Sequence, residues 1–215
     1  MGDVAETRRL ILASSSPRRQ ALLEGLGVTF EVVAPEVDEL RYPDEEPYDY
    51  VERIARSKAE AVSIPGAVVV AADTSVVVDG QILGKPAHPE EARAMLRRLS
   101  DQTHEVLTGV AVAVDDGTAE TVAEVASALV RFLPMTEEEI ADYVASGEPM
   151  DKAGAYALNG RAALYIESIQ GSPSGVIGLP LHVVARLLRT AGCDLLSFVG
   201  PAPADLAWQS LLPDA

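Results

Sequence analysis

The chain has 215 residues and a formal net charge of −16, and this length fits one α/β domain or two small lobes that share a sheet. The charge argues against nucleic-acid binding, because a nucleic-acid-binding protein needs a basic face that displaces counterions from phosphates. No uncharged apolar run reaches the roughly 18 residues of a membrane span, and the single cysteine, Cys193, excludes an internal disulfide. The apolar run 10–13 is too short for a signal peptide, so we expect a cytoplasmic protein.

The first half of the chain alternates strand-like and helical segments. A polar turn of three serines follows the first apolar run, and Pro17 suits the first position of a helix with Ser16 as its N-cap. The run 67–72 is continuously apolar, as in a strand covered on both faces, and it stops at Asp73-Thr74. The expected elements are a strand over 10–13, a helix from 17 to the glycines at 25 and 27, a strand over 28–33, an acidic loop over 35–47, a helix over 48–63, a strand over 67–72 and a hairpin of 76–78 with 81–83.

The second half adds a long hairpin and three helices. Thr136 and Glu139 form a capping box at the start of one of these helices. The expected elements are a helix over 89–99, strands over 105–114 and 118–132 joined at Asp116-Gly117, a helix over 137–146, strand character at 155–158 and 164–169, and a last helix from Pro180 to Gly192. We expect one domain over 1–200 and a peripheral tail over 201–215.

The pair Arg18-Arg19 stands in the first turn of a helix, where cations oppose the partial positive charge of the helix N-terminus. A bound anion would reverse the sign of this effect. Free backbone N–H groups, the preceding serine hydroxyls and the two guanidinium groups therefore predict a phosphate cradle. The alternative is a pair of solvated surface arginines.

Three further charged residues suggest chemistry. Lys58 falls on the apolar face of its helix, so its ammonium either snorkels to the rim or meets an acid or a phosphate. Asp73 follows a buried strand, where it caps a turn, orients a water or holds a metal. Glu39 is a second candidate metal ligand or one more solvated acid. Because the free protein would gain little from Arg18 or Lys58, we expect that removing either cation stabilises the free protein or barely alters its stability.

Other segments resemble known motifs but lack a residue that the motif requires. The segment 171–175 looks like a nucleophile elbow, but Pro173 stands where serine is required. His104-Glu105 begins like a zinc-binding helix, but Thr108 replaces the second histidine. The three histidines of the chain carry no metal spacing, and neither a Walker A sequence nor a G-x-G-x-x-G is present.

Five segments in register resemble the Maf family of nucleotide pyrophosphatases, and the resemblance covers about residues 9–192. They are LASSSPRR at 12–19, ADT at 72–74, LGKP at 83–86, GEPMDKAGAY at 147–156 and GLPL at 178–181. The resemblance implies an α/β fold like that of the inosine triphosphate pyrophosphatase type. Its elongated mixed β-sheet is flanked by helices, with two lobes around a central cleft, and the protein is often a homodimer.

The resemblance also implies hydrolysis between the α and β phosphates of a nucleoside triphosphate with a divalent metal, Mg²⁺ or Mn²⁺. By position, Glu39 and Asp73 match the family's acidic pair, which makes both candidate metal ligands. Whether Asp73 is a general base or a metal ligand stays open. The expected catalytic residues are Asp73, Glu39, Lys58 and Lys85, and the expected substrate-binding residues are Ser14, Arg18, Arg19, Thr74 and Asn159.

Within the family, DKAGAY at 151–156 is similar to the branch that hydrolyses dTTP and UTP in nucleotide-pool housekeeping. Asn159 stands where that branch usually has glutamine, and Gly175 where asparagine is common. Two rival functions are a nucleotide-binding regulator of cell division without turnover and a purine-selective pyrophosphatase of the inosine triphosphate type.

Overall fold

The computed structural model describes residues 8–114 and 121–200. The expected turn at Asp116-Gly117 and the tail over 201–215 lie outside these ranges. The elements are β1 (Arg9–Ala13), α1 (Pro17–Glu24), β2 (Glu31–Val32), α2 (Pro47–Glu60), β3 (Ala67–Val78), β4 (Gln81–Leu83), α3 (Pro89–Leu99), β5 (Thr103–Val114), β6 (Val122–Phe132), α4 (Glu137–Ala145), β7 (Ile166–Gln170), α5 (Pro173–Ile177) and α6 (Leu181–Thr190), with short 3₁₀ helices η1 (Glu148–Asp151), η2 (Ala153–Ala155), η3 (Arg161–Tyr165) and η4 (Leu195–Phe198).

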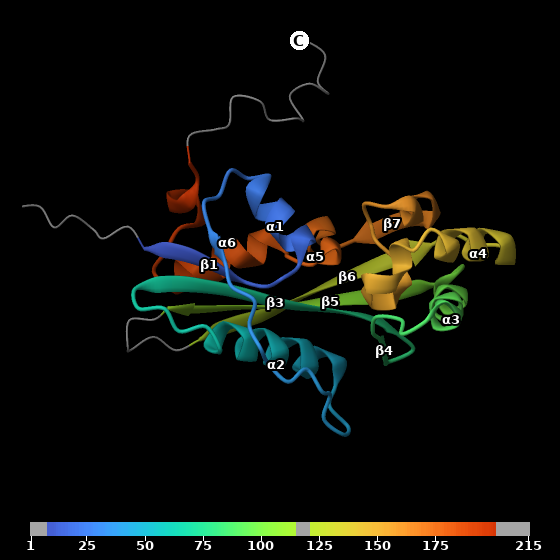
Figure 1. Cartoon of the computed structure of the whole chain (residues 1–215), viewed down its shortest axis with the longest axis horizontal. Helices are drawn as coiled ribbons and strands as arrows, with labels where there is room; N and C mark the ends of the chain where they lie inside the picture. The colour runs from blue at the N-terminus through green and yellow to red at the C-terminus, as the bar shows by residue number, and fades with distance from the viewer. Residues whose placement is uncertain (1–7, 115–120, 201–215) are drawn as a thin grey trace, which may run out of the picture.

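The strands form one mixed seven-stranded sheet in the order β2-β1-β3-β5-β6-β7, with β4 beside β3. β1 pairs in parallel with β2 and β3, whereas β3, β5, β6 and β7 pair antiparallel. In Figure 1, α2 covers one face of the sheet, α1, α5 and α6 cover the other, and α3 and α4 lie at the far end. The expected α/β fold with an elongated mixed sheet flanked by helices is confirmed.

An interruption beside β3 determines where a ligand can reach the sheet. One edge of β3 pairs with β1 as far as Ala71 and with β4 from Val76 onward. Among the described strands, residues 72–75 pair only with β5, on the opposite edge. The prediction that this strand stops at Asp73 is therefore wrong, because small and β-branched residues continue the pairing with β5 to Val77. The strand that ends here is β1.

Alternation along β3 sends the side chains of this open segment to both faces of the sheet. Asp73 shares its face with Val69 and Ala71, which pack in one cluster with residues of α2. Thr74 shares the opposite face with Val70 and Ala72, which pack with residues of α6. One short gap in the pairing thus presents a carboxylate toward α2 and a hydroxyl toward the α1 side.

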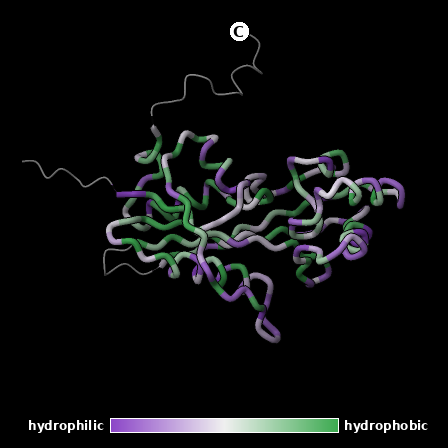
Figure 2. The backbone as a smooth tube through the Cα atoms, in the orientation of Figure 1, coloured by the Kyte–Doolittle hydropathy of each residue, from purple (hydrophilic) through white to green (hydrophobic). Residues whose placement is uncertain are grey.

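Two apolar clusters on the α1 side of the sheet correspond to the two expected lobes. The first joins the first half of β3 with β1 and α6, and the second joins the other half of β3 with α3 and α4. Figure 2 shows the apolar strands that run through the centre. The long strands β3 and β5 are shared by both lobes, which fixes the lobes relative to each other.

A glycine allows α2 to lie close to the sheet at the level of the gap. Gly109 on β5 is the register partner of Asp73. A Cβ atom at position 109 would lie 2.3 Å from the main-chain oxygen of Val51 in α2, far inside contact distance. The sheet therefore accepts α2 directly over the strand pair that carries Asp73.

Local predictions hold best where capping or periodicity is strong. The helix over 89–99 and the capping box of Thr136 are confirmed. The predicted strand at 155–158 is wrong, because Gly154 and Ala155 adopt left-handed φ angles of 67° and 59° and form a 3₁₀ turn. The second strand is reduced to β2, and the short helix α5 was not expected.

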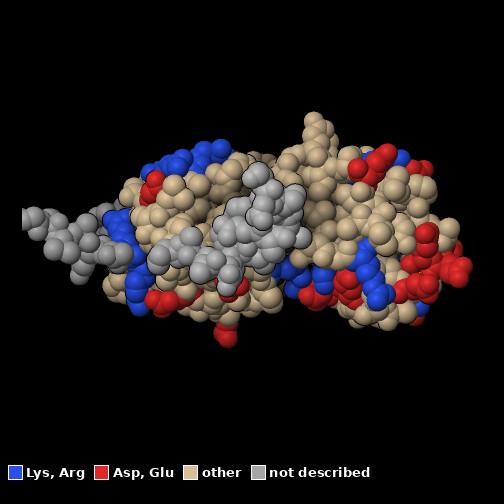
Figure 3. All heavy atoms as spheres, turned by 90° about the horizontal axis from the view of Figure 1, so that it is seen from above, with Lys and Arg blue, Asp and Glu red and all other residues tan. Residues whose placement is uncertain are grey.

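No helix in the described ranges has the length and apolarity needed to cross a membrane. Acidic side chains gather at the end of the molecule formed by α3 and α4, as Figure 3 shows. The first turn of α3 carries Glu90 and Glu91, and the first turn of α4 carries three glutamates at 137–139. Carboxylates in these positions stabilise the helix, because they face the partial positive charge of its N-terminus.

The second lobe encloses one histidine. His104 on β5 is 2% exposed, and its Nε2 atom forms a 2.8 Å hydrogen bond with the hydroxyl of Tyr156. The rings of Phe132 and Tyr156 contact it edge to face. Burial lowers the pKa of His104 from 6.5 to about 4, so the folded protein holds a neutral imidazole where the unfolded chain would take up a proton.

This burial predicts an acid-dependent loss of stability. Between pH 6.5 and about 4 the unfolded state binds the extra proton, so the free energy of unfolding falls as the pH is lowered. By pH 5 the loss from His104 should reach about 2 kcal/mol. Urea unfolding of the wild type and of His104→Gln at pH 7.5 and pH 5 isolates this contribution, since the other titrating groups are common to both. Equal pH dependence of the two proteins would contradict it.

Candidate active site

The cleft between the two lobes is a cavity of about 480 Å³, within the size range of small-molecule sites. It opens at the interrupted edge of β3, and its wall combines the turn before α1, α2, the start of the β4–α3 connection and the turns after α4. The structure brings together all nine residues predicted from the sequence, namely Ser14, Arg18, Arg19, Glu39, Lys58, Asp73, Thr74, Lys85 and Asn159.

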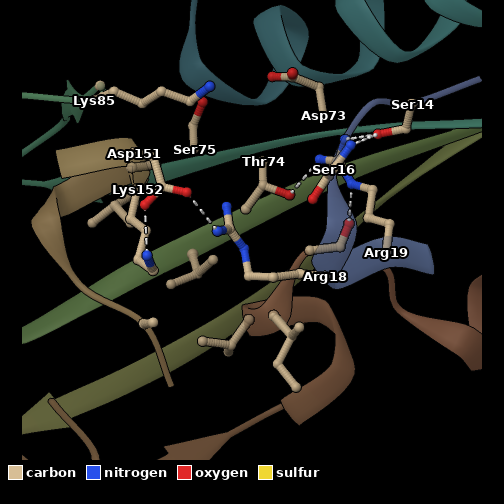
Figure 4. A pocket seen from close by; sticks show the side chains of 18 of the residues that line it. Ser14, Ser16, Arg18, Arg19, Asp73, Thr74, Ser75, Lys85, Asp151 and Lys152 are labelled. Carbon is tan, nitrogen blue, oxygen red and sulfur yellow. Dashed lines mark hydrogen bonds and ion pairs between the residues drawn. The ribbon is translucent and has the colours of Figure 1, made fainter. Parts of the chain in front are cut away.

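Arg19 is the best-anchored cation of the cleft. Its Nε donates to the main-chain oxygen of Gly178 at 2.8 Å, its Nη1 to Ser14 Oγ at 3.0 Å and its Nη2 to Thr74 Oγ1 at 3.2 Å. Figure 4 shows its guanidinium between the serine turn and β3. Burial lowers the pKa of Arg19, and the charge of Asp73 opposes that shift. The free protein thus fixes this side chain in one place without stabilising its charge fully.

Arg18 reaches across the cleft to the other lobe. Its Nη1 atom lies 3.3 Å from Oδ2 of Asp151, and Lys152 Nζ lies 2.6 Å from Oδ1 of the same carboxylate. Both contacts are visible in Figure 4. Arg18 and Asp151 are 29% and 69% exposed, respectively, so water screens their attraction.

On the α2 side, one ammonium holds two carboxylates. Lys58 Nζ lies 2.7 Å from Asp73 Oδ1 and 2.8 Å from Glu39 Oε1. The side chains of Lys58 and Asp73 are only 11% and 12% exposed, whereas that of Glu39 is 55% exposed. Of the alternatives for Lys58, the one in which it meets an acid is therefore confirmed. These ion pairs revise the expectation that the free protein gains little from this lysine.

The acidic loop that carries Glu39 is tied to α2. The hydroxyl of Tyr50 donates to the main-chain oxygen of Glu39 at 3.0 Å. Arg53 donates to both carboxylate oxygens of Glu45, at 2.6 and 2.8 Å, and to the main-chain oxygen of Leu40. Burial, with the nearby charges of Asp73 and Glu39, raises the pKa of Tyr50 to about 12, so its hydroxyl remains a donor. These contacts hold an exposed carboxylate at the rim of the cleft.

The remaining predicted residues lie on the wall of the second lobe. Lys85 is exposed, and Figure 4 shows its side chain pointing toward Ser75. Asn159 lies on an exposed turn between η2 and η3 and lines the cleft beside Tyr156. Thr74 contacts Arg19 and Thr108, so it belongs to the wall that holds the arginines.

Sequence reasoning missed two charged residues of the cleft. Asp151 and Lys152 belong to the motif at 147–156, which predicts no separate role for either residue. The structure places Asp151 against Arg18, and Lys152 against the same carboxylate. Lys152 Nζ also donates to the main-chain oxygen of Glu148 at 2.7 Å. The signal available was the adjacent acid and base in a segment without apolar periodicity, which alone cannot place a side chain in a cleft.

Two carboxylates face the cleft from the α2 side, and the described ranges hold no group of three or more metal-ligating side chains. Mg²⁺ is typically held by one or two carboxylates together with substrate phosphates and waters. Lys58 contacts one oxygen of Asp73 and one of Glu39, and each carboxylate has a second oxygen. This donor set fits a divalent cation that binds together with a phosphorylated ligand.

The mixed sheet and the cation-lined cleft define an α/β protein with a site built for a small anionic ligand. The chain belongs to the Maf family, since the family model described as "Maf-like protein" matches residues 9–191. A dTTP/UTP pyrophosphatase of Symbiobacterium thermophilum is 54% identical over 192 residues, which cover 88% of this chain and 97% of that protein. A dTTP/UTP pyrophosphatase of Methylococcus capsulatus is 50% identical over 203 residues, which cover 93% and 99%.

Among solved structures, a HAM1 protein from Coxiella burnetii matches 85% of this chain and 99% of its own, with 14% identity and a TM-score of 0.46. At that score the likeness bears on neither the substrate nor the mechanism of this chain.

The two ion pairs predict effects of different size when their cations are removed. Lys58→Ala leaves Asp73 buried without its partner and should lower the free energy of unfolding by about 3 kcal/mol. Arg18→Ala breaks an exposed pair and should change it by less than about 1 kcal/mol. Urea unfolding measures both, and Lys58→Ala with Asp73→Asn should recover part of the loss. Equal effects of the two single substitutions would contradict the assignment.

Proposed function

We propose that the chain is a nucleoside triphosphate pyrophosphatase that hydrolyses dTTP and UTP to the monophosphate and pyrophosphate, in the housekeeping of a cytoplasmic nucleotide pool. The observation that carries this proposal is the convergence of Arg18, Arg19, Lys58 and Lys85 on one cleft that also contains the carboxylates of Glu39 and Asp73 on the α2 side. The names of relatives about half identical to this chain support the same reaction and substrates. The expected homodimer stays a prediction.

The cations are arranged to bind a chain of phosphates. Arg19 is held by neutral oxygens, so its charge is available to a phosphate, and the N-terminus of α1 adds backbone N–H groups on the same side. Lys58 and Lys85 approach from α2 and from the β4–α3 connection. The charge that develops on the leaving pyrophosphate would be neutralised by groups already in position, which is the main source of catalysis in phosphoryl transfer.

Asp73 is the residue that we propose acts on the attacking water. Its carboxylate is held by Lys58 through Oδ1. Asp73 lies on the segment of β3 that is open to the cleft at one edge and pairs with β5 at the opposite edge. A carboxylate fixed in this way accepts a proton from a water directed at the α phosphorus, or serves as a ligand of a divalent cation. Glu39 is the second carboxylate that Lys58 contacts, and it lies nearer to solvent.

The carboxylates of Glu39 and Asp73 would hold the Mg²⁺ or Mn²⁺ ion. When bound, such an ion offsets the charge of the triphosphate and favours attack at phosphorus. A net charge of −16 makes this contribution important, because the cations of the cleft must bind a tetra-anion within an acidic protein.

An assay of pyrophosphate release distinguishes the proposed function from its two rivals. A nucleotide-binding regulator would bind triphosphates in this cleft and release no pyrophosphate. A pyrophosphatase of the inosine triphosphate type would turn over purine nucleotides in preference to pyrimidine nucleotides. The carboxylate pair held by Lys58 favours turnover over simple binding, because a binding site for a polyanion has no need of acidic groups.

We expect Asp73→Asn to lower turnover by about 100-fold or more, since it removes the proposed base or ligand without removing volume. Pyrophosphate release from a panel of eight ribo- and deoxyribonucleoside triphosphates in Mg²⁺, for the wild type and the variant, tests the residue and the function together. Nucleotide binding should persist in the variant. A variant that keeps a tenth of the wild-type rate would contradict the catalytic role of Asp73. A wild type that releases no pyrophosphate would contradict the proposed enzymatic function.

Asn159 is expected to tune base selectivity. Its amide offers a donor and an acceptor to the pairing edge of uracil or thymine. It is about 1.5 Å shorter than glutamine by ordinary bond geometry, so we expect its contact with the base to run through a bridging water. Asn159→Gln should sharpen the preference for UTP over CTP by up to about tenfold, if roughly 1 kcal/mol is recovered from a direct hydrogen bond. The measurement is the ratio of kcat/KM for the two nucleotides, and an unchanged ratio would contradict the assignment.

A further inference from the structure

Glu148, the first residue of η1, lies behind the wall of the cleft that carries Asn159. One of its carboxylate oxygens, Oε1, accepts a hydrogen bond from the hydroxyl of Tyr143 at 2.9 Å. The backbone N–H of Arg161 donates to both oxygens of the same carboxylate, at 3.1 and 3.2 Å. The side chain therefore joins the end of α4 to the start of η3, the element that follows Asn159.

The other end of this turn is held by Tyr143, the residue that donates to Glu148. The backbone N–H of Ala157 donates to the hydroxyl oxygen of Tyr143 at 3.4 Å. Within the turn, the backbone N–H of Gly160 donates to the main-chain oxygen of Ala157 at 3.3 Å. Residues 157 and 161 are thus both tied to one hydrogen-bonded pair, and Asn159 stands between them.

Gly160 is what permits this contact. A Cβ atom at position 160 would lie 1.9 Å from Glu148 Oε1 and 2.6 Å from its carboxyl carbon. A larger residue would push the carboxylate away from the turn and break its hydrogen bonds to Arg161. Burial and the hydrogen bond to Glu148 raise the pKa of Tyr143, so its hydroxyl keeps the proton that it donates.

The phosphate side of the cleft depends on Glu148 only through its main chain. Lys152 Nζ donates to the main-chain oxygen of Glu148, and this atom remains when the side chain is replaced. A change of the side chain therefore loosens the turn that carries Asn159 and leaves the contacts of Lys152 and Arg18 in place.

We propose that Glu148, together with Tyr143, is a positioning residue that determines how strictly the site selects the base of its substrate. The proposal rests on the proposed function, because it assigns the turn 157–160 to the base. Glu148 contacts no substrate atom in this scheme. It holds the Arg161 end of the turn directly and the Ala157 end through Tyr143, which limits the positions that the Asn159 amide can adopt.

The experiment compares Glu148→Ala, Glu148→Gln and Tyr143→Phe with the control Glu138→Ala, an acid on the exposed side of α4. Calorimetry gives the Kd of each protein for UTP, for ATP and for inorganic tripolyphosphate, which has no base. Glu148→Ala and Tyr143→Phe should raise the Kd for UTP about tenfold and reduce the preference for UTP over ATP. The Kd for tripolyphosphate should change less than about twofold.

Glu148→Gln should recover most of the selectivity, because its amide oxygen still accepts hydrogen bonds, and the control should match the wild type. A double substitution of Glu148 and Tyr143 should lose little more than either alone, since both act on one turn. Parallel weakening of UTP and tripolyphosphate binding would overturn the proposal, because it would indicate general damage to the cleft. Unchanged selectivity in properly folded Tyr143→Phe and Glu148→Ala would also overturn it.

Failure of the proposed function gives a different result. A wild type that releases no pyrophosphate from any triphosphate is not the enzyme, but the binding comparison needs no turnover. If that protein still binds UTP more tightly than ATP and loses the preference in the variants, the role of Glu148 in base selection stands.

Discussion

β1 and β4 both pair with the same edge of β3, and neither covers residues 72–75. β1 ends at Ala13 because a serine turn and Pro17 then begin a helix, and β4 is a three-residue arm of a tight hairpin. The open segment places a carboxylate on one face of the sheet and a hydroxyl on the other. α1 and α2, which lie on opposite faces, can therefore direct Arg19 and Lys58 to the same cleft.

The electrostatics of the cleft follow from this arrangement. Lys58 is buried and balanced by two acids, and Arg18 is partly buried and shares Asp151 with Lys152. Arg19 differs, because each of its three side-chain hydrogen bonds within the described ranges goes to a neutral oxygen. A phosphate that contacts Arg19 displaces no carboxylate, whereas one that contacts Arg18 competes with Asp151. Arg19 is thus ready to bind an anion, whereas Lys58 and Arg18 would exchange a carboxylate for it.

The sequence predicted the helices, and which residues line the cleft, more closely than it predicted the course of the strand and turns that carry those residues. Charge placed against local preference identified Arg18, Arg19 and Lys58, because such placement is unfavourable without a partner. The course of β3 past Asp73 could not be predicted, since pairing with β5 is a long-range interaction that outweighs the local polar signal. The turn at 153–155 depends on left-handed backbone angles, which the small residues there allow but do not reveal.

The two walls of the cleft are stabilised by different interactions, apolar packing on one side and hydrogen bonds between turns on the other. The wall that holds Arg19 and Lys58 consists of side chains on α1, α2 and β3, which are fixed by the apolar packing of the first lobe. The wall that carries Asn159 consists of short turns, and hydrogen bonds from Tyr143 and Glu148 hold it in place. Under the proposed function, a substitution in the turns would alter which base fits while the phosphate contacts persist. Selectivity would then change independently of the chemistry, because under this proposal the two depend on separate parts of the structure.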